Sequence, residues 1–268
     1  MINFFAIVAM GFFLGMRHAT DPDHVIAVMT IVTRQRRVSR AALTGMFWGI
    51  GHTLTIFLVG ALIILFNVAI PARIGLSMEF SVGLMLVILG LMNVSSFSRA
   101  LQQQHSDSEH HELVHSHAHS HGDYVHTHPH AHSPDAHPHD PNRTPVTVMD
   151  RLFGRIGIYQ QIRPLVIGIV HGLAGSAAVA LLVLTTIRDP RWAVAYLLVF
   201  GIGTIAGMML ITMSLASAFN FAVRRRMKFS RGLGLASGVL SLGFGLVIAY
   251  QMGIVSGLFS AHPHWIPR

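Results

Sequence analysis

The chain reads Arg17-His18-Ala19-Thr20-Asp21-Pro22-Asp23-His24 in the middle of an otherwise apolar segment that runs from Ile2 to Thr33. A continuous helix over that segment would extend about 48 Å, whereas the hydrocarbon core of a bilayer is about 30 Å thick. Pro22 lacks the backbone donor that a helix interior needs, and it pushes the preceding residue away from helical geometry. We therefore expect a membrane helix that is broken near Pro22.

The composition of the whole chain supports this membrane assignment. Of its 268 residues, 52% are hydrophobic and only 11% are charged, whereas soluble domains carry about 25% charged residues. The short alternating segments of a membrane β-barrel are not seen. The predicted fold class is an all-α, polytopic integral membrane protein.

Six apolar segments are long enough to cross a bilayer as helices, which takes about 20 residues each. A long polar insert separates the third from the fourth. The predicted spans are Ile2–Thr33, Ala41–Phe66, Glu79–Phe97, Pro164–Ile187, Trp192–Phe219 and Gly232–Met252.

The basic residues predict the orientation of these spans. The formal charge of +8 might indicate a nucleic-acid binder, but the Arg residues lie in short runs between apolar spans. Such runs mark cytoplasmic loops, so we expect no nucleic-acid partner. Basic runs follow the first and fifth spans and bracket the insert, which predicts a multi-pass protein of the cell (inner) membrane with a cytoplasmic insert and both termini outside.

Similar motifs recur in the two halves of the chain at a separation of 152 to 155 residues. Because a unit of three spans enters the membrane in the opposite sense the second time, this predicts a 3+3 inverted repeat. The alternative is coincidental glycine in small-residue packing faces. The matched pairs are Gly15 and His18 with Gly168 and His171, Gly49 and Gly51 with Gly201 and Gly203, and Gly83 and Gly90 with Gly238 and Gly245.

Four domains follow from these boundaries. Residues 1–98 form the first three-helix repeat with the polar motif, and residues 99–163 form a cytoplasmic, His-rich, disordered loop. Residues 164–256 form the second three-helix repeat, and residues 257–268 form a short C-terminal tail.

The polar stretch in the first span predicts a metal site. His18, Asp21, Asp23 and His24 can all ligate a metal, and a charged group at membrane depth costs about 2.5 to 3.5 kcal/mol. A divalent cation would offset that cost. The alternatives are an extramembrane loop, or a structural ion pair between Arg17 and one of the aspartates.

Two further histidines are candidate ligands, His52 in the second span and His171 at the start of the fourth. A lone buried histidine usually has a structural role, but His171 occupies the position equivalent to His18 in the repeat. The chain has no cysteine, so the ligands would be nitrogen and oxygen, which suit Ni²⁺, Co²⁺ and Zn²⁺. We expect no tightly bound cofactor.

The motif His18-x-x-x-x-Asp23-His24 resembles the signature of the nickel/cobalt transporter (NiCoT) family, and Gly51-His52-Thr53 is similar to the second motif of that family. The resemblance implies secondary transport of Ni²⁺ or Co²⁺ across the membrane, with Zn²⁺ as a further candidate. It also implies that His18, Asp23, His24 and His52 select and bind the metal.

The chain departs from the family pattern in two ways. It lacks the extra span that precedes the signature helix, and a later helix reads His171-Gly172-Leu173-Ala174-Gly175-Ser176 where the family has an acidic motif. The second half looks more like six-span relatives grouped with urease accessory membrane proteins. Metal preference and transport direction are therefore open at this point.

Thirteen of the nineteen histidines lie between His105 and His139, in the polar insert. Such a low-complexity segment cannot bury a core. Neutral imidazoles bind divalent metals loosely, and less well as the pH falls through their pKa of about 6.5. The insert could capture imported ions, supply an exporter or deliver metal to a cytoplasmic metallochaperone; the alternative is a solvated linker.

Two functions other than transport are compatible with the same residues. An intramembrane metalloenzyme would use His18, Asp23, His24 and His171 to hold Zn²⁺ or iron with an open position for water. The H-E-x-x-H pattern of many such enzymes is absent, so we expect no enzymatic activity. A metal sensor would bind the ion without moving it.

Overall fold

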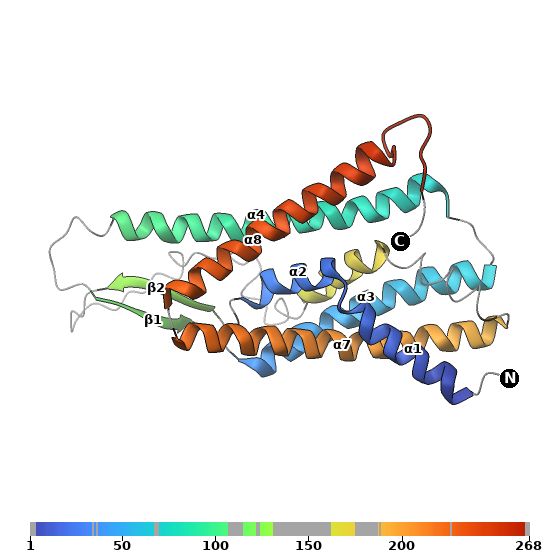
Figure 1. The fold of residues 1–268 in the computed structure, drawn as a ribbon, viewed down its shortest axis with the longest axis horizontal. Helices are drawn as coiled ribbons and strands as arrows, with labels where there is room; N and C mark the ends of the chain where they lie inside the picture. The colour runs from blue at the N-terminus through green and yellow to red at the C-terminus, as the bar shows by residue number, and fades with distance from the viewer. Residues whose placement is uncertain are drawn as a thin grey trace.

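A computed structural model describes residues 4–33, 35, 37–66, 70–106, 115–121, 124–130, 162–174, 187, 189–225 and 227–265. Long helices run roughly side by side along the molecule (Figure 1). The helices are α1 (Phe4–His18), α2 (Pro22–Val32), α3 (Val38–Phe66), α4 (Ala72–Ser106), the helix Ile162–Ala174, α7 (Pro190–Arg225) and α8 (Met227–Tyr250), which ends in a π-helical turn (Gln251–Val255).

The helices agree with the prediction of a multi-pass membrane protein. Within the described residues, four are long and apolar enough to cross a bilayer, and they lie in α3, α4, α7 and α8. The helices Pro22–Val32 and Ile162–Ala174 are apolar but shorter. The second half of the predicted span Pro164–Ile187 falls largely outside the described residues.

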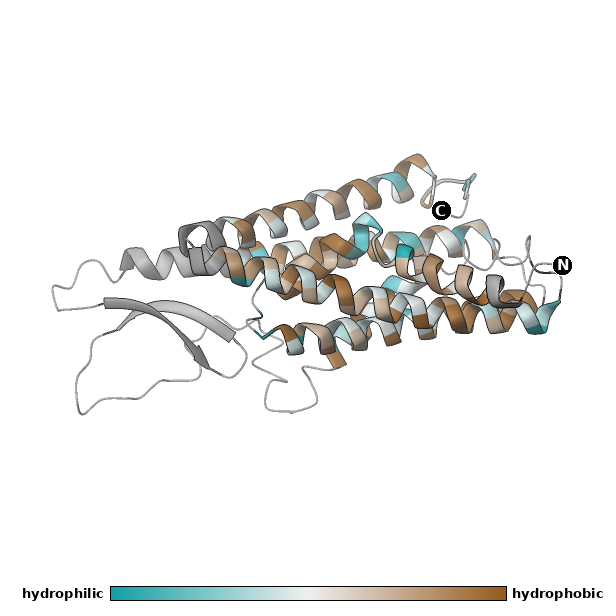
Figure 2. Cartoon of the chain, turned by 60° about the horizontal axis from the view of Figure 1, so that its bottom comes forward, coloured by the Kyte–Doolittle hydropathy of each residue, from teal (hydrophilic) through white to brown (hydrophobic). Residues whose placement is uncertain are grey.

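Hydrophobic residues predominate along the long helices (Figure 2). On α3, Leu54, Leu58, Leu62 and Leu65 are exposed and recur every three or four residues. This spacing places them on one face of the helix. Because the described part of the chain leaves this stripe exposed, it is a face that a lipid bilayer would cover.

The first predicted span is broken, as expected. α1 ends at His18, a turn follows at Ala19–Asp21, and α2 begins at Pro22. Pro22 takes the first position of α2, where a proline is tolerated because its missing donor would have no helical partner there. Asp21 before it has the extended backbone (φ −59°, ψ 143°) that a following proline favours.

Some predicted boundaries differ from those of the helices. α4 begins at Ala72, seven residues before the predicted start at Glu79. Pro71 precedes it and its carbonyl accepts the first backbone hydrogen bonds, from Ile74 and Gly75. The predicted bounds described the span that crosses the bilayer, and the helix continues beyond that span.

Regular structure was not expected in the His-rich insert, yet two parts of it are ordered as strands. β1 (His115–His121) pairs antiparallel with β2 (Tyr124–His130), with His115, His117 and His119 opposite His130, His128 and His126. The strands alternate histidine with other residues, a period of two that suits a β-strand. Apart from the end of α4 at Ser106, the rest of the insert lies outside the described residues.

Glycines allow several helix pairs to approach closely. A Cβ atom on Gly15 would overlap the carbonyl oxygen of Phe200, and one on Gly203 would overlap that of Phe12, so α1 and α7 touch through their backbones. The helix Ile162–Ala174 meets α3 in the same way: Gly168 abuts the carbonyl of Trp48, and Gly51 abuts that of Leu165.

The short helix α2 occupies the centre of the bundle. It contacts α4, α7 and α8, and α4 packs along α8. Ala27, Val28 and Val32 of α2 are fully buried in a cluster with apolar residues such as Trp48, Leu86 and Met208. This packing fixes the first turn of α2, with its ionisable residues, in the interior.

Candidate metal centre

The break between α1 and α2 places ionisable side chains from both helices in one pocket. In an unbroken helix His24 would lie about 240° around the axis from His18. The turn is closed by backbone hydrogen bonds from Thr20 N–H to the Arg17 carbonyl (2.8 Å) and from Asp21 N–H to the His18 carbonyl (3.1 Å). It redirects the chain, so that the rings of His18 and His24 lie 4.8 Å apart, centroid to centroid.

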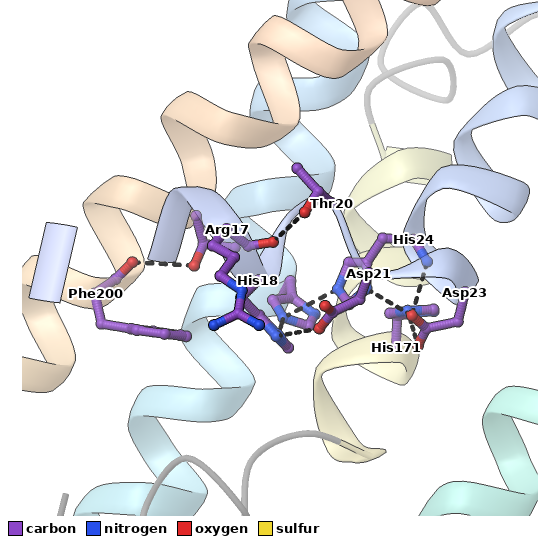
Figure 3. A network of polar contacts seen from close by, with 10 residues as sticks. Arg17, His18, Thr20, Asp21, Asp23, His24, His171 and Phe200 are labelled. Carbon is purple, nitrogen blue, oxygen red and sulfur yellow. Dashed lines mark hydrogen bonds and ion pairs between the residues drawn. The ribbon is translucent and has the colours of Figure 1, made fainter. Parts of the chain in front are cut away.

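All six residues expected to form a metal site come together, from α1, the turn before α2, α2, α3 and the helix Ile162–Ala174. We call this group the histidine pocket. Its members are His18, Asp21, Asp23, His24, His52 and His171. Figure 3 labels those outside α3, namely His18, Asp21, Asp23, His24 and His171.

Three imidazole nitrogens converge at the centre of the pocket. The Nε2 atom of His52 lies 3.1 Å from Nε2 of His18 and 3.5 Å from Nε2 of His24. Three nitrogens bound about 2.0–2.1 Å from one ion would lie about 2.9 Å apart at right-angled positions and about 3.4 Å apart at tetrahedral ones. The two separations from His52 therefore fall in or near the range for ligands around a single cation.

Carboxylates hold two of these rings from the opposite side. Asp21 Oδ2 lies 2.8 Å from Nδ1 of His18, and Asp23 Oδ1 lies 3.0 Å from Nδ1 of His24. A ring that donates from Nδ1 to a carboxylate keeps its lone pair on Nε2, which is the usual arrangement for metal-binding histidines. Both rings thus present a free lone pair to the centre.

Asp23 also connects the pocket to the second half of the chain. Its other oxygen, Oδ2, lies 3.0 Å from Nε2 of His171, which is within ion-pair distance but outside the geometry of a hydrogen bond. The rings of His24 and His171 are 4.2 Å apart. Asp23 therefore faces two imidazoles, whereas Asp21 faces one.

The pocket holds buried polar atoms that have no hydrogen-bond partner among the described residues. These are Nδ1 of His52 and both ring nitrogens of His171. His24, His52 and His171 are at most 2% exposed. A buried polar atom without a partner costs about 1–3 kcal/mol, so these nitrogens are costly to bury without a ligand.

Two aromatic rings border the pocket that sequence reasoning did not identify. Trp48 packs edge-on against His171, with centroids 5.7 Å apart, and Phe200 lies 5.5 Å from His18. Trp48 lies on α3 one turn before His52, which is the only sequence signal that could have indicated it. Both rings contribute apolar walls.

Thr53 and Thr55 on α3 do not contribute ligands. Thr53 Oγ donates to the Gly201 carbonyl (3.2 Å), and Thr55 Oγ donates to the Ile169 carbonyl (3.0 Å). These hydrogen bonds tie α3 to α7 and to the helix Ile162–Ala174. The hydroxyl that follows His52 in the second motif therefore has a structural role.

Comparison with known proteins found a matching family and a similar protein. Residues 4–255 match the model of a protein family, NicO, described as high-affinity nickel-transport protein. The chain is 34% identical over 258 residues to the urease accessory protein UreH of Bacillus sp. (strain TB-90), covering 96% of each chain. No solved structure matches the chain.

Proposed function

This chain belongs to the NicO family of high-affinity nickel-transport proteins, and on that premise we propose that it moves Ni²⁺ across the cell membrane through the histidine pocket. Transport of metal ions by a multi-pass membrane protein follows from the family and the apolar helices. The predicted resemblance to nickel/cobalt transporters and to urease accessory membrane proteins is confirmed. An enzymatic role is set aside, because the family is one of transporters.

The observation that carries the proposal is the convergence of the three Nε2 atoms at 3.1 and 3.5 Å inside an apolar bundle. Imidazole nitrogens at these separations can bind one divalent cation together through their lone pairs. Imidazole and carboxylate also bind Co²⁺ and Zn²⁺, which are the competing substrates to test.

The contacts of the glycines support an inverted repeat. Gly15 contacts α7 near Gly203, and Gly168 contacts α3 near Gly51. These two contacts are equivalent, because Gly15 and Gly168 are matched positions of the repeat and so are Gly51 and Gly203. Likewise Gly49 abuts Ile205 while Gly201 abuts Thr53, and Gly83 abuts Gly245 while Gly90 abuts Gly238. If a two-fold axis relates the two halves, the two contacts of each pair are equivalent by symmetry. Transporters of this kind place their site where the repeats meet, near the membrane midplane.

The orientation that we propose has the insert in the cytoplasm and both termini outside. α2, α4 and α7 end, and α3 and α8 begin, toward the end of the molecule that carries β1 and β2 (Figure 1). The basic runs therefore gather at one end, as the positive-inside rule expects for the cytoplasmic side.

The His-rich insert would then meet the ion on the cytoplasmic side. Its loosely binding imidazoles could hold arriving nickel and pass it to a cytoplasmic metallochaperone. This role is separable from transport, because the insert lies outside the membrane-spanning helices.

Nickel flux into proteoliposomes of known orientation tests the proposal. The wild type should transport Ni²⁺, and His18→Ala should reduce flux by about 10–100-fold, the effect expected when support of a metal site is lost. His264→Ala, which changes an exposed histidine of the C-terminal segment that is not part of the pocket, is the matched control and should be silent. Binding without flux in the wild type would instead indicate a sensor.

Competition and a deletion refine the same experiment. Excess Co²⁺ or Zn²⁺ should reduce nickel flux if either ion shares the pocket. Removal of Gln102–Asn142 should leave flux in place if the insert is a buffer; its loss would make the insert part of the pathway.

A further inference from the structure

We propose that the histidine pocket offers the ion two successive positions that share His24, and that only one of them can be filled at a time. This rests on the proposed function, because it describes how the ion would pass through the same pocket. Five of the six residues form two three-ligand groups, His18–His24–His52 and Asp23–His24–His171, whose ligand atoms lie within 4.8 Å of one another in each group.

The two groups meet His24 on opposite ring nitrogens. Nε2 of His24 points to His52 at 3.5 Å, whereas Nδ1 lies 3.0 Å from Asp23, the carboxylate that also reaches His171. The groups therefore lie on either side of one imidazole ring. An ion bound to Nε2 occupies the first position, and an ion bound to Nδ1 occupies the second.

The chemistry of imidazole makes the positions exclusive. A neutral imidazole has a lone pair on only one of its two nitrogens, and the other nitrogen carries a proton. His24 can thus complete one group or the other, but not both. The expected stoichiometry of the pocket is one ion per chain, although five of its side chains belong to the two groups.

The proposed repeat gives each position one of its two equivalent histidines. His18 and His171 occupy matching places in the two halves of the chain, and each belongs to a different group. A transporter built from two opposed halves needs a site that each half can present in turn, and His24 between them is the common element.

Nickel binding and flux, measured on the same full-length variants, test the two positions. A chelator buffer keeps the concentration of free Ni²⁺ low enough that exposed imidazoles stay empty. His24→Ala lacks the residue that both groups share, so the nickel that this variant still binds measures binding by the His-rich insert. The wild type should bind one ion above that background. His52→Ala and His171→Ala should each still bind one ion, with an affinity lowered about tenfold or more. In each variant, flux should fall by a larger factor than the affinity does.

Cobalt gives a second readout that does not depend on flux. Its absorption spectrum reports the ligands, so Co²⁺ bound to His171→Ala should differ from Co²⁺ bound to His52→Ala. Two ions bound by the wild type, identical cobalt spectra, or unchanged flux in His171→Ala would overturn the two positions while leaving transport intact. If instead the binding pattern holds and the wild type shows no flux, the two positions stand and the transport function fails.

Discussion

At the scale of single residues, two aspartates with similar sequence context have different tasks. Asp23 is 27% exposed and faces His24 and His171, whereas Asp21 is 47% exposed and faces only His18. Water screens and replaces the contacts of an exposed carboxylate more readily. The charge of Asp23 should therefore matter more to metal binding.

The pair Asp23→Asn and Asp21→Asn tests this difference with the same change of one atom. We expect Asp23→Asn to weaken nickel binding by about 10–100-fold, the range for a group that supports a metal site, and Asp21→Asn to weaken it less. Equilibrium binding in detergent measures both. Equal losses would mean that the two carboxylates contribute alike.

At the scale of the elements, glycine decides how the helices meet. Gly168 is pressed against the backbone of Trp48 on α3, whereas Gly243 on α8 has open space where its Cβ would lie. Alanine at the first position must push two helices apart. At the second it meets nothing and improves helix propensity.

Gly168→Ala should therefore lower stability by about 1–3 kcal/mol, the cost of overpacking, and weaken nickel binding because His171 lies one turn further along the same helix. Gly243→Ala is the matched control and should leave nickel binding unchanged without lowering stability. Thermal unfolding in detergent and nickel binding measure the two effects. If Gly168→Ala changes neither the thermal stability nor nickel binding, the helices can separate at little cost.

The C-terminal segment is a second element, and several contacts hold it against α4. The Trp265 indole N–H donates to the buried carboxylate of Glu79 (2.8 Å), and its ring packs over Gly75 at the start of α4. Gly257 allows the chain to turn back toward α4 because its φ is +75°, a conformation that other residues rarely adopt.

Trp265→Phe keeps an aromatic ring but removes the donor, and a hydrogen bond to a charged group contributes about 1.5–3 kcal/mol. We expect a lower thermal midpoint and increased proteolysis of the segment after Gly257. Trp192→Phe, at a tryptophan that is 47% exposed, is the comparison. A midpoint equal to that of the wild type would show that the ring alone holds the segment.

At the scale of the whole molecule, α2 joins two parts of the bundle. α4 and α8 pack along each other, while α1 and α3 pack along α7, and α2 contacts α4, α7 and α8. The pocket begins at the first turn of α2. Any movement of the α4–α8 pair against the other helices would therefore act directly on Asp23 and His24.

The natural absence of cysteine makes the orientation in the membrane testable on the intact molecule. We expect Ala261→Cys, in the exposed C-terminal segment, to react with a membrane-impermeant maleimide in intact cells. Ser39→Cys, exposed at the start of α3, should react only after the membrane is opened. The reverse pattern would place the His-rich insert outside the cell.

The sequence alone determined the membrane class, the break at Pro22 and the identity of the polar residues, because hydropathy, the missing donor of proline and the cost of charge in lipid act locally. It also indicated His52 and His171, through a motif and through the repeat. It did not predict the strands β1 and β2 or the early start of α4, because the composition of these segments resembles that of loops.

Only the tertiary structure decided how the six residues meet. Their side chains come from four helices, and the 3.1 Å approach of His18 to His52 and the bridge from Asp23 to His171 depend on how those helices cross. Distances of that kind are set by backbone contacts such as Gly51 with Leu165, which arise between segments more than a hundred residues apart. A pattern along the chain carries the ligands, but packing between distant helices creates the space that they share.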